Sequence, residues 1–213
     1  MRYSTSKLTV QNLINSAGEL AARVGFPNVT TRGIARLSGE NIGTIHYHFG
    51  SKDKLLEAVV HEVIEKKRHL LRNVLKEGGE LETKDSQAKM IRKLVRRNID
   101  NMFRSENPVW HSRAVFQVLQ TEWRLKDIVQ REMIDPELTA LKAFFKKVKP
   151  SLTDEKAFQH ALLMGIPVYF HADYSKSIKD KLGKDEYSEE YLNYLEDVIT
   201  YQTQCAMGLP SDK

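Results

Sequence analysis

Side chains that can bind a polyanion gather at the start of the chain. Residues 1 to 54 carry seven Lys or Arg side chains against three Asp or Glu, so this quarter holds +4 of the total net charge of +5. When cationic side chains neutralise phosphates they release condensed counterions, and a basic segment therefore favours a nucleic acid partner. Charge alone leaves a second reading equally open, that of an ordinary soluble surface that is basic.

Residues suited to metal or catalytic chemistry are present, but not at useful spacings. His46 and His48 are two residues apart and would diverge on a helix, whereas His61 and His69 would lie roughly 12 Å apart along a helix axis. The sequence has no HExxH, CxxC or GxxxxGK[ST] motif, and Cys205 is its single cysteine. We therefore expect no metal, no cofactor and no enzymatic activity. We also expect a reducing cytoplasmic location and a small, buried packing role for Cys205.

The elements that must position these residues are helices. Apolar residues recur at helical spacing from Leu13 to Val24, and Gly25 then ends the pattern. We predict short helices from Thr30, as a cap, to Leu37 and over 41–49, and a long helix over 52–76. Further helices are predicted over 85–105, 108–122, 125–148, 154–181 and 188–207, with Pro136 and Pro167 kinking or restarting two of them. No alternating strand pattern occurs, and no apolar run reaches the ~20 residues that span a bilayer, so we expect an all-α protein with no membrane partner.

The stretch from Val29 to Lys54 has the organisation of a helix-turn-helix. Two short helical patterns are joined by a tight turn at Gly39, and Ala35, four residues earlier, is small enough for the helices to pack closely. Ile34 and Ile45 would face a small core from either side of the turn. In such a motif the second helix enters the major groove of DNA, although many other helical corners share this simple pattern.

Taken whole, this stretch resembles the DNA-binding head of the tetracycline-repressor family. The family pattern has a Thr-capped helix, an Ile-Ala pair, a turn glycine, a Gly-Thr-[Leu/Ile]-Tyr-x-[His/Tyr]-Phe helix and then Ser-Lys-x-x-Leu. The matching residues here are Thr30, Ile34-Ala35, Gly39, Gly43-Thr44-Ile45-His46-Tyr47-His48-Phe49, Ser51-Lys52 and Leu55. The resemblance covers about residues 8 to 60. Glu40 and His46 depart from the pattern, which more often has Val and Tyr there.

The resemblance, with the geometry of the motif, implies a set of DNA contacts. Hydroxyl and ammonium groups near helix ends grip the phosphate backbone, and the candidates are Thr30, Thr31, Tyr47 and Lys52. Candidates for contacts with base edges are Arg32, Thr44 and His46, of which Arg32 is the best reader of guanine. Asn41 would either cap the recognition helix or touch DNA, and Gly43 would allow that helix to approach the groove. Tyr47 and Phe49 could both be core aromatics, and we expect that role for Phe49 only.

Beyond the head, only the layout of helices resembles the family. We predict a helix-turn-helix domain over residues 1–51, built as a three-helix bundle, and a larger helical ligand-sensing and dimerisation domain over residues 52–213. The resemblance implies a ligand cavity between the long helix and the helices near 100–145. Its candidate lining, each member of which could instead be ordinary core or surface, is Trp110, Arg113, Phe116, Gln117, Gln120, Trp123 and His171. The basic run Lys66-Lys67-Arg68 is expected to be an exposed helix face.

The last two predicted helices carry more apolar surface than packing on a single body requires. The simplest explanation is a four-helix interface between two copies of the chain. The sequence thus predicts a transcriptional regulator that binds a near-palindromic double-stranded operator as a homodimer, with repression relieved by a small-molecule effector. Two alternatives stay open: a helical-bundle enzyme or lipid-binding protein that carries the same head, and a purely structural oligomer.

Overall fold

The computed structural model describes residues 2–79, 81–108, 110–121 and 125–211, and within them it contains helices and no strand. The predicted all-α class is confirmed. Contacts divide the chain into two compact units, one of Met1–Arg68 with Asn107–Met133 and one of His69–Glu106 with Ile134–Lys213. This division differs from the predicted boundary after residue 51, because the helices that follow residue 51 and residue 109 pack against the first helix. The assignment of functions to two domains stays a prediction.

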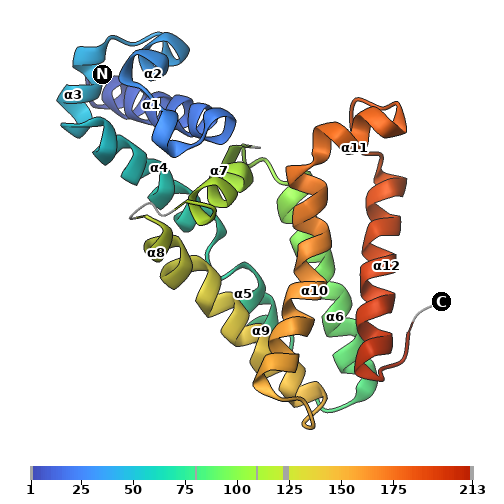
Figure 1. Ribbon diagram of the computed structural model, residues 1–213. Coiled ribbons are helices and arrows are strands. Elements are labelled where there is room, and N and C mark those ends of the chain that lie inside the picture. The colour runs from blue at the N-terminus through green and yellow to red at the C-terminus, as the bar shows by residue number, and fades with distance from the viewer. Residues whose placement is uncertain (1, 80, 109, 122–124, 212–213) are drawn as a thin grey trace. The chain divides into compact units, whose positions relative to one another are not determined.

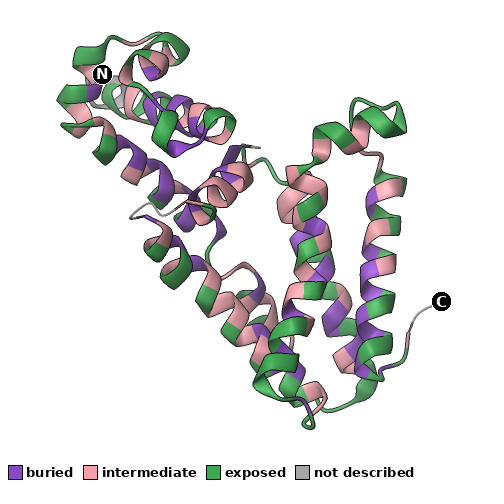
Figure 2. Ribbon diagram, viewed as in Figure 1, coloured by how far each residue is buried: buried purple, intermediate pink, exposed green. Residues whose placement is uncertain are grey.

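The first unit is built on its N-terminal helix. Its elements are α1 (Arg2–Val24), a 3-10 turn (Phe26–Asn28), α2 (Thr31–Ser38), α3 (Ile42–Phe49), α4 (Lys52–Lys67), α7 (Trp110–Leu119) and α8 (Lys126–Val129) (Figure 1). Helices α2, α4 and α7 each pack on α1. Leu13 and Ala17 of α1 are fully buried together with Ile34 of α2 and Ile45 of α3. Figure 2 shows this buried side of α1.

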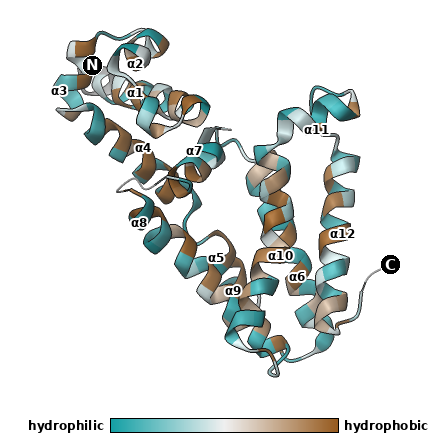
Figure 3. Ribbon diagram, in the orientation of Figure 1, coloured by the Kyte–Doolittle hydropathy of each residue, from teal (hydrophilic) through white to brown (hydrophobic). Residues whose placement is uncertain are grey.

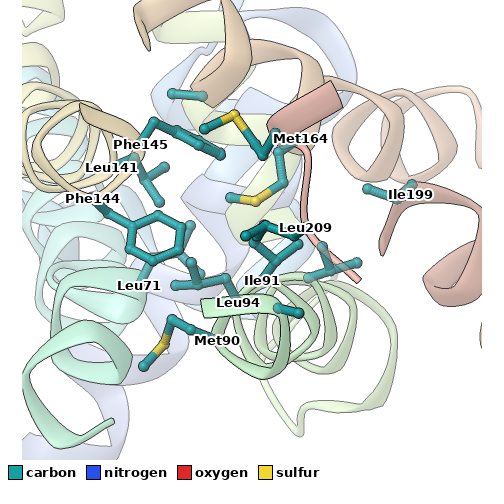
Figure 4. Packing of buried hydrophobic residues seen from close by; sticks show 14 of the residues in the cluster. Leu71, Met90, Ile91, Leu94, Leu141, Phe144, Phe145, Met164, Ile199 and Leu209 are labelled. Atoms are coloured by element: carbon teal, nitrogen blue, oxygen red, sulfur yellow. The ribbon is translucent and has the colours of Figure 1, made fainter. Parts of the chain in front are cut away.

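The second unit has its own apolar core. Its helices are α5 (Leu70–Glu77), α6 (Lys84–Ile99), α9 (Asp135–Val148), α10 (Asp154–Asp173), α11 (Ser175–Leu182) and α12 (Glu189–Met207). Apolar and polar residues alternate around these helices (Figure 3), so each helix buries one side. Figure 4 shows Phe144 and Phe145 of α9, Ile91 and Leu94 of α6 and Met164 of α10 meeting in this core.

The predicted continuous helix over residues 52–76 is wrong. Helix α4 ends at Lys67, Arg68 is extended, and His69 adopts a left-handed conformation with φ 63° before α5 begins. The first N–H groups of α5 find a partner elsewhere: Glu137 of α9 accepts hydrogen bonds from the backbone N–H of Leu71 at 2.7 Å and of Arg72 at 3.1 Å. A carboxylate suits the positive end of a helix. Because this cap comes from a distant helix, nothing within residues 52–76 signals the break.

Other predicted boundaries differ from the structure in smaller ways. The predicted helix over 154–181 is two helices, with Tyr174 ending α10, whereas Pro167 lies inside α10 without ending it. Pro136 lies in the first turn of α9, which continues without a break from a π-helical turn at Gln130–Ile134, so the predicted kink or restart takes the form of a change of helix type just before Pro136. A second π-helical turn at Asp100–Arg104 follows α6.

Helix α7 sits against α1 at a point where only glycine fits. The side chain of Trp110 is 5% exposed, and a Cβ atom added to Gly18 would lie 2.4 Å from its indole ring. Real Cβ atoms do not approach that closely, so the indole or the helix would have to move. The contact between α1 and α7 therefore depends on the missing side chain of Gly18.

We predict that Gly18→Ala lowers the free energy of unfolding by about 1–3 kcal/mol, the usual cost of overpacking. Helix propensity alone would give the opposite sign, since alanine is favoured over glycine in a helix interior by about 0.5–1 kcal/mol. Urea denaturation provides the measurement. Gly165→Ala in α10, where the nearest side-chain atom lies at 3.3 Å, is the matched control and should be as stable as the parent protein or more stable by up to about 1 kcal/mol. A stabilising Gly18→Ala would contradict the packing described.

Candidate nucleic-acid interface

Two side-chain caps and one glycine set the geometry of α2 and α3. The Thr30 hydroxyl accepts a hydrogen bond from the Gly33 N–H at 3.1 Å and so caps α2. Helix α2 ends at Gly39, which has the left-handed conformation φ 72°, ψ 7°. The Asn41 side chain then accepts from the Thr44 N–H at 2.8 Å and caps α3. Of the two roles open for Asn41, the structure contains the cap.

The cap of α3 also explains Gly43. A Cβ atom at position 43 would lie 2.9 Å from the Asn41 side-chain oxygen, so a larger residue would press on the cap. At the other end of the motif, the Asn12 amide of α1 donates to the Ser38 carbonyl oxygen at 2.9 Å. This bond ties the last turn of α2 to α1. The helix pair is thereby attached to α1 through both its buried isoleucines and this polar contact.

The side of α3 that faces away from the core is exposed and polar. Tyr47 is 84% exposed, which excludes a core role in this chain, and His46 is exposed as well; Arg32, on the neighbouring α2, is also exposed. Thr31 and Thr44 are half-buried. The His46 Nδ1 atom lies 3.0 Å from the Gly50 carbonyl oxygen, a contact that orients the imidazole ring. These residues present hydroxyl, imidazole and guanidinium groups to solvent, which are the groups that contact phosphates and base edges.

Phe49 and Lys52 have surroundings that the sequence did not predict. Phe49 is half-buried rather than enclosed in the core. Lys52 is half-buried too, and its ammonium donates to the Val29 carbonyl oxygen at 2.9 Å. This bond joins the first turn of α4 to the segment before α2, so Lys52 supports the motif. A phosphate contact by Lys52, which stays a prediction, would have to share or replace that bond.

The described members of the predicted ligand-binding set belong to two different units. Trp110 is buried against Gly18, Arg113, Phe116 and Gln117 are half-buried on α7, and Gln120 is exposed just after that helix. His171 belongs to the second unit, where its Nδ1 lies 2.7 Å from the Pro167 carbonyl oxygen and its Nε2 3.0 Å from the Tyr191 hydroxyl. Trp123 lies outside the described residues. The role of these residues in ligand binding stays a prediction.

The first unit contains a small apolar cavity that the sequence did not reveal. Its accessible volume is about 10 Å³, and it is lined by Val60, Val63, Ile64, Ala114, Val115, Val118 and Val129. These residues come from α4, α7 and α8. Small aliphatic residues at helical spacing are typical of ordinary core, so their pattern carries no sign of a cavity.

The burial of two polar side chains in the first unit, Lys67 and His111, was also not predicted from the sequence. Lys67 is only 7% exposed, and its ammonium donates to the Ser112 hydroxyl at 2.8 Å; burial lowers the pKa of Lys67 to about 8. His111 is 2% exposed, and burial, followed by the positive charges of Lys67 and Lys66, lowers its pKa to about 4. The predicted exposed face over residues 66–68 is therefore wrong at Lys67. Its spacing of four residues from buried Val63 could have indicated this.

The remaining predictions concern the single cysteine, metal ligands and membrane-spanning helices. Cys205 is exposed, so the predicted buried packing role is wrong. Within the described residues no three His, Cys, Asp or Glu side chains lie together as a metal site would require. In the same residues, every helix is too short or too polar to cross a lipid bilayer.

The arrangement of α2, the Gly39 turn and α3 defines the first unit as a helix-turn-helix DNA-binding unit. Residues 13–59 match the model of the bacterial regulatory proteins of the tetR family. A transcriptional regulator from a Rhodococcus species is similar in fold, with a TM-score of 0.60, 17% identity, and coverage of 92% of this chain and 96% of that one. A tetR-family regulator from Haemophilus influenzae gives a TM-score of 0.57 at 17% identity, covering 92% and 96%. No curated protein matches the chain. Residues 13–59 of this chain therefore resemble the DNA-binding segment of the tetR family of bacterial regulatory proteins.

We predict that Asn41→Ala lowers the free energy of unfolding by about 0.5–2 kcal/mol, because the first turn of α3 loses its cap. Asn41→Ser, which keeps an oxygen able to accept from the Thr44 N–H, should retain most of that stability. Urea denaturation of the two variants beside the parent protein provides the comparison. Equal destabilisation by serine and alanine would mean that the cap is not what Asn41 contributes.

Proposed function

We propose that the protein is a homodimeric cytoplasmic repressor that binds a near-palindromic operator through α3 and is released from it by a small-molecule effector. The observation that carries the proposal is the exposed polar side of α3, held in place by the Asn41 cap and the Gly39 turn. A helix presented in this way fits the major groove of DNA. Arg32, Thr44 and His46 are the proposed readers of base edges, and Thr30, Thr31, Tyr47 and Lys52 the proposed phosphate contacts.

The proposal of a dimer rests on exposed apolar residues in the second unit. On α10, Leu163 is 67% exposed, Ile166 52%, Phe170 50% and Tyr174, at its end, 53%. Their spacing of three or four residues puts them on one side of the helix. On α12, which packs beside α10, Tyr194 and Tyr201 are exposed seven residues apart. A monomer in water gains nothing from such a stripe, whereas a second copy of the chain would bury it.

A dimer gives the DNA contact its symmetry. Two copies of α3 related by a two-fold axis read two half-sites in opposite directions, and their separation sets the spacing of those half-sites. An effector that binds the free and the DNA-bound arrangements with different affinity will change operator affinity by the ratio of the two. A tenfold ratio corresponds to about 1.4 kcal/mol.

We predict that Arg32→Ala costs roughly 1–3 kcal/mol on the best operator and relaxes preference at one base pair. Lys52→Ala should instead weaken binding to every sequence and reduce the salt slope by about one unit. Gel-shift titrations on the best operator and on single-base variants, at two salt concentrations, measure both effects. Thermal unfolding of Lys52→Ala must be recorded in parallel, because the variant also loses the bond to Val29. If Arg32→Ala weakened all sequences alike, the assignment of Arg32 as a base reader would be wrong.

We predict that Leu163→Asp raises the dimer dissociation constant by about 100-fold or more, since it places two buried like charges in the proposed interface. Sedimentation velocity across a concentration series is the measurement. Thr139→Asp, which adds the same carboxylate to an exposed position of α9, is the control and should leave dimerisation unchanged. A Leu163→Asp protein that stays dimeric at the parent concentrations would remove this side of α10 from the interface.

A further inference from the structure

Two buried polar side chains, Lys67 and His111, lie one helical turn from residues that line the cavity of the first unit. Lys67 follows two lining residues of α4, Val63 and Ile64, by one helical turn. His111 precedes two lining residues of α7, Ala114 and Val115, by one turn, and so shares their side of the helix. The hydrogen bond from Lys67 to Ser112 brings these two helix ends together. The cavity lining is wholly aliphatic, and Lys67 and His111 stand one helical turn beyond its lining residues on α4 and α7.

Lys67 lacks a counter-ion among the described residues. An ammonium can donate three hydrogen bonds, and the structure gives Lys67 one, to Ser112. Its neighbour Glu65 pairs with Arg68 at 2.9 Å and is not available. Burying a charge without a partner is strongly unfavourable. A partner from outside the described residues would explain a buried lysine in this state, and a bound anion is such a partner.

His111 adds a second unsatisfied group. Its Nδ1 atom is buried and has no hydrogen-bond partner in the described part of the chain. The Trp110 ring meets the imidazole edge-on, with centroids 4.1 Å apart, and so keeps this side of the ring from water. A buried polar atom of this kind normally has a partner.

We propose that Lys67, Ser112 and His111 bind the head of a small monocarboxylate whose alkyl part enters the cavity between α4, α7 and α8. This site would hold the effector of the proposed repressor, and the inference therefore rests on that function. A carboxylate oxygen completes the donor set of Lys67 and accepts from the neutral imidazole. The aliphatic lining has no partner for the hydroxyl groups of a sugar or polyol.

Charge balance selects a monoanion. At neutral pH the site holds one positive charge, that of Lys67, because His111 with its pKa lowered to about 4 is uncharged there. A carboxylate cancels that charge. A phosphate dianion would leave one uncompensated negative charge in an apolar site. Burying that charge would be as unfavourable as burying the unpaired positive charge of Lys67.

The cavity volume limits the length of the alkyl part. About 10 Å³ of accessible volume is the space for a single water, so a longer chain enters only as the lining side chains move aside. Each methylene that becomes buried should improve affinity by up to about fourfold, from its transfer free energy. Affinity should therefore rise from acetate to butyrate by at most about 15-fold, on the same estimate, and then level off as the cost of moving valines grows.

The first test is titration calorimetry with sodium butyrate, at constant ionic strength made up with chloride. Butyramide, which has nearly the same shape without the charge, should bind at least tenfold more weakly than butyrate. Lys67→Met should lose butyrate binding by tenfold or more while its melting temperature stays equal or rises, because the buried charge is gone. Lys66→Met, which removes an exposed charge from the next position, is the matched control and should bind as the parent does.

The pH dependence gives a test that needs no variant. The pKa of Lys67 is lowered to about 8, so the ammonium is present at pH 7 and lost as the pH rises through 8. Among the described residues, His111 of α7, which is neutral over this pH range, and the exposed Lys66 of α4 are the other titratable groups that interact here. Butyrate should bind about tenfold more weakly at pH 9 than at pH 7, from one proton lost. A flat profile would overturn the site.

Other outcomes also overturn the inference: no butyrate binding at 10 mM, equal binding of butyrate and butyramide, or equal loss in Lys66→Met and Lys67→Met. If Lys67→Met does not fold, Ser112→Ala replaces it, keeps the charge and should still weaken butyrate binding several-fold. A gel shift with saturating butyrate separates this inference from the proposed function. If butyrate binds at Lys67 without changing operator affinity, effector release is refuted and the carboxylate site is retained. If only uncharged compounds release the operator, the carboxylate site is refuted and the repressor function is retained.

Discussion

The position of the recognition helix depends on a tight left-handed turn. Gly39 has φ 72° and ψ 7°, a conformation that costs a residue with a Cβ atom roughly 1–2 kcal/mol. This turn allows α3 to leave α2 at an angle while Ile34 and Ile45 remain fully buried on the same side. The caps at Thr30 and Asn41 then satisfy N–H groups at the start of each helix. The exposed polar side of α3 follows from these constraints, since the opposite side packs against α2 and α4.

The rest of the first unit holds α1, and therefore α3, in place. Trp110 of α7 packs on Gly18, and Lys52 of α4 bonds to Val29 in front of α2. The same packing leaves a buried ammonium, an imidazole atom with no hydrogen-bond partner among the described residues, and an aliphatic cavity between α4 and α7. Burying such polar groups costs stability. The ligand proposed above would recover part of this cost by pairing with them, and its binding would stabilise the folded chain.

Much of the head could be predicted from the sequence, whereas the body could not. The structure of the helix-turn-helix is determined by local signals. The capping residues, the glycine turn and the spacing of apolar residues each act within a few positions along the chain. The break between α4 and α5 depends on Glu137, which lies far along the chain, and local patterns cannot contain it. The same is true of Lys67, whose burial depends on α7. A basic run such as Lys66-Lys67-Arg68 is predicted to be exposed when only its charge is considered. The position of Lys67 on the apolar side of α4, four residues after Val63, indicates burial instead. Cys205 was predicted to be buried and is exposed, because cysteines are usually buried and the prediction did not take its position on the helix into account.

Selection of bound fragments from random double-stranded DNA with the intact protein shows whether α3 of two subunits reads DNA sequence. After several rounds at physiological salt, we expect an enriched inverted repeat whose half-sites lie about one helical turn or a multiple of it apart. Recovery of fragments without a shared sequence, or of a single unrepeated site, would contradict this expectation.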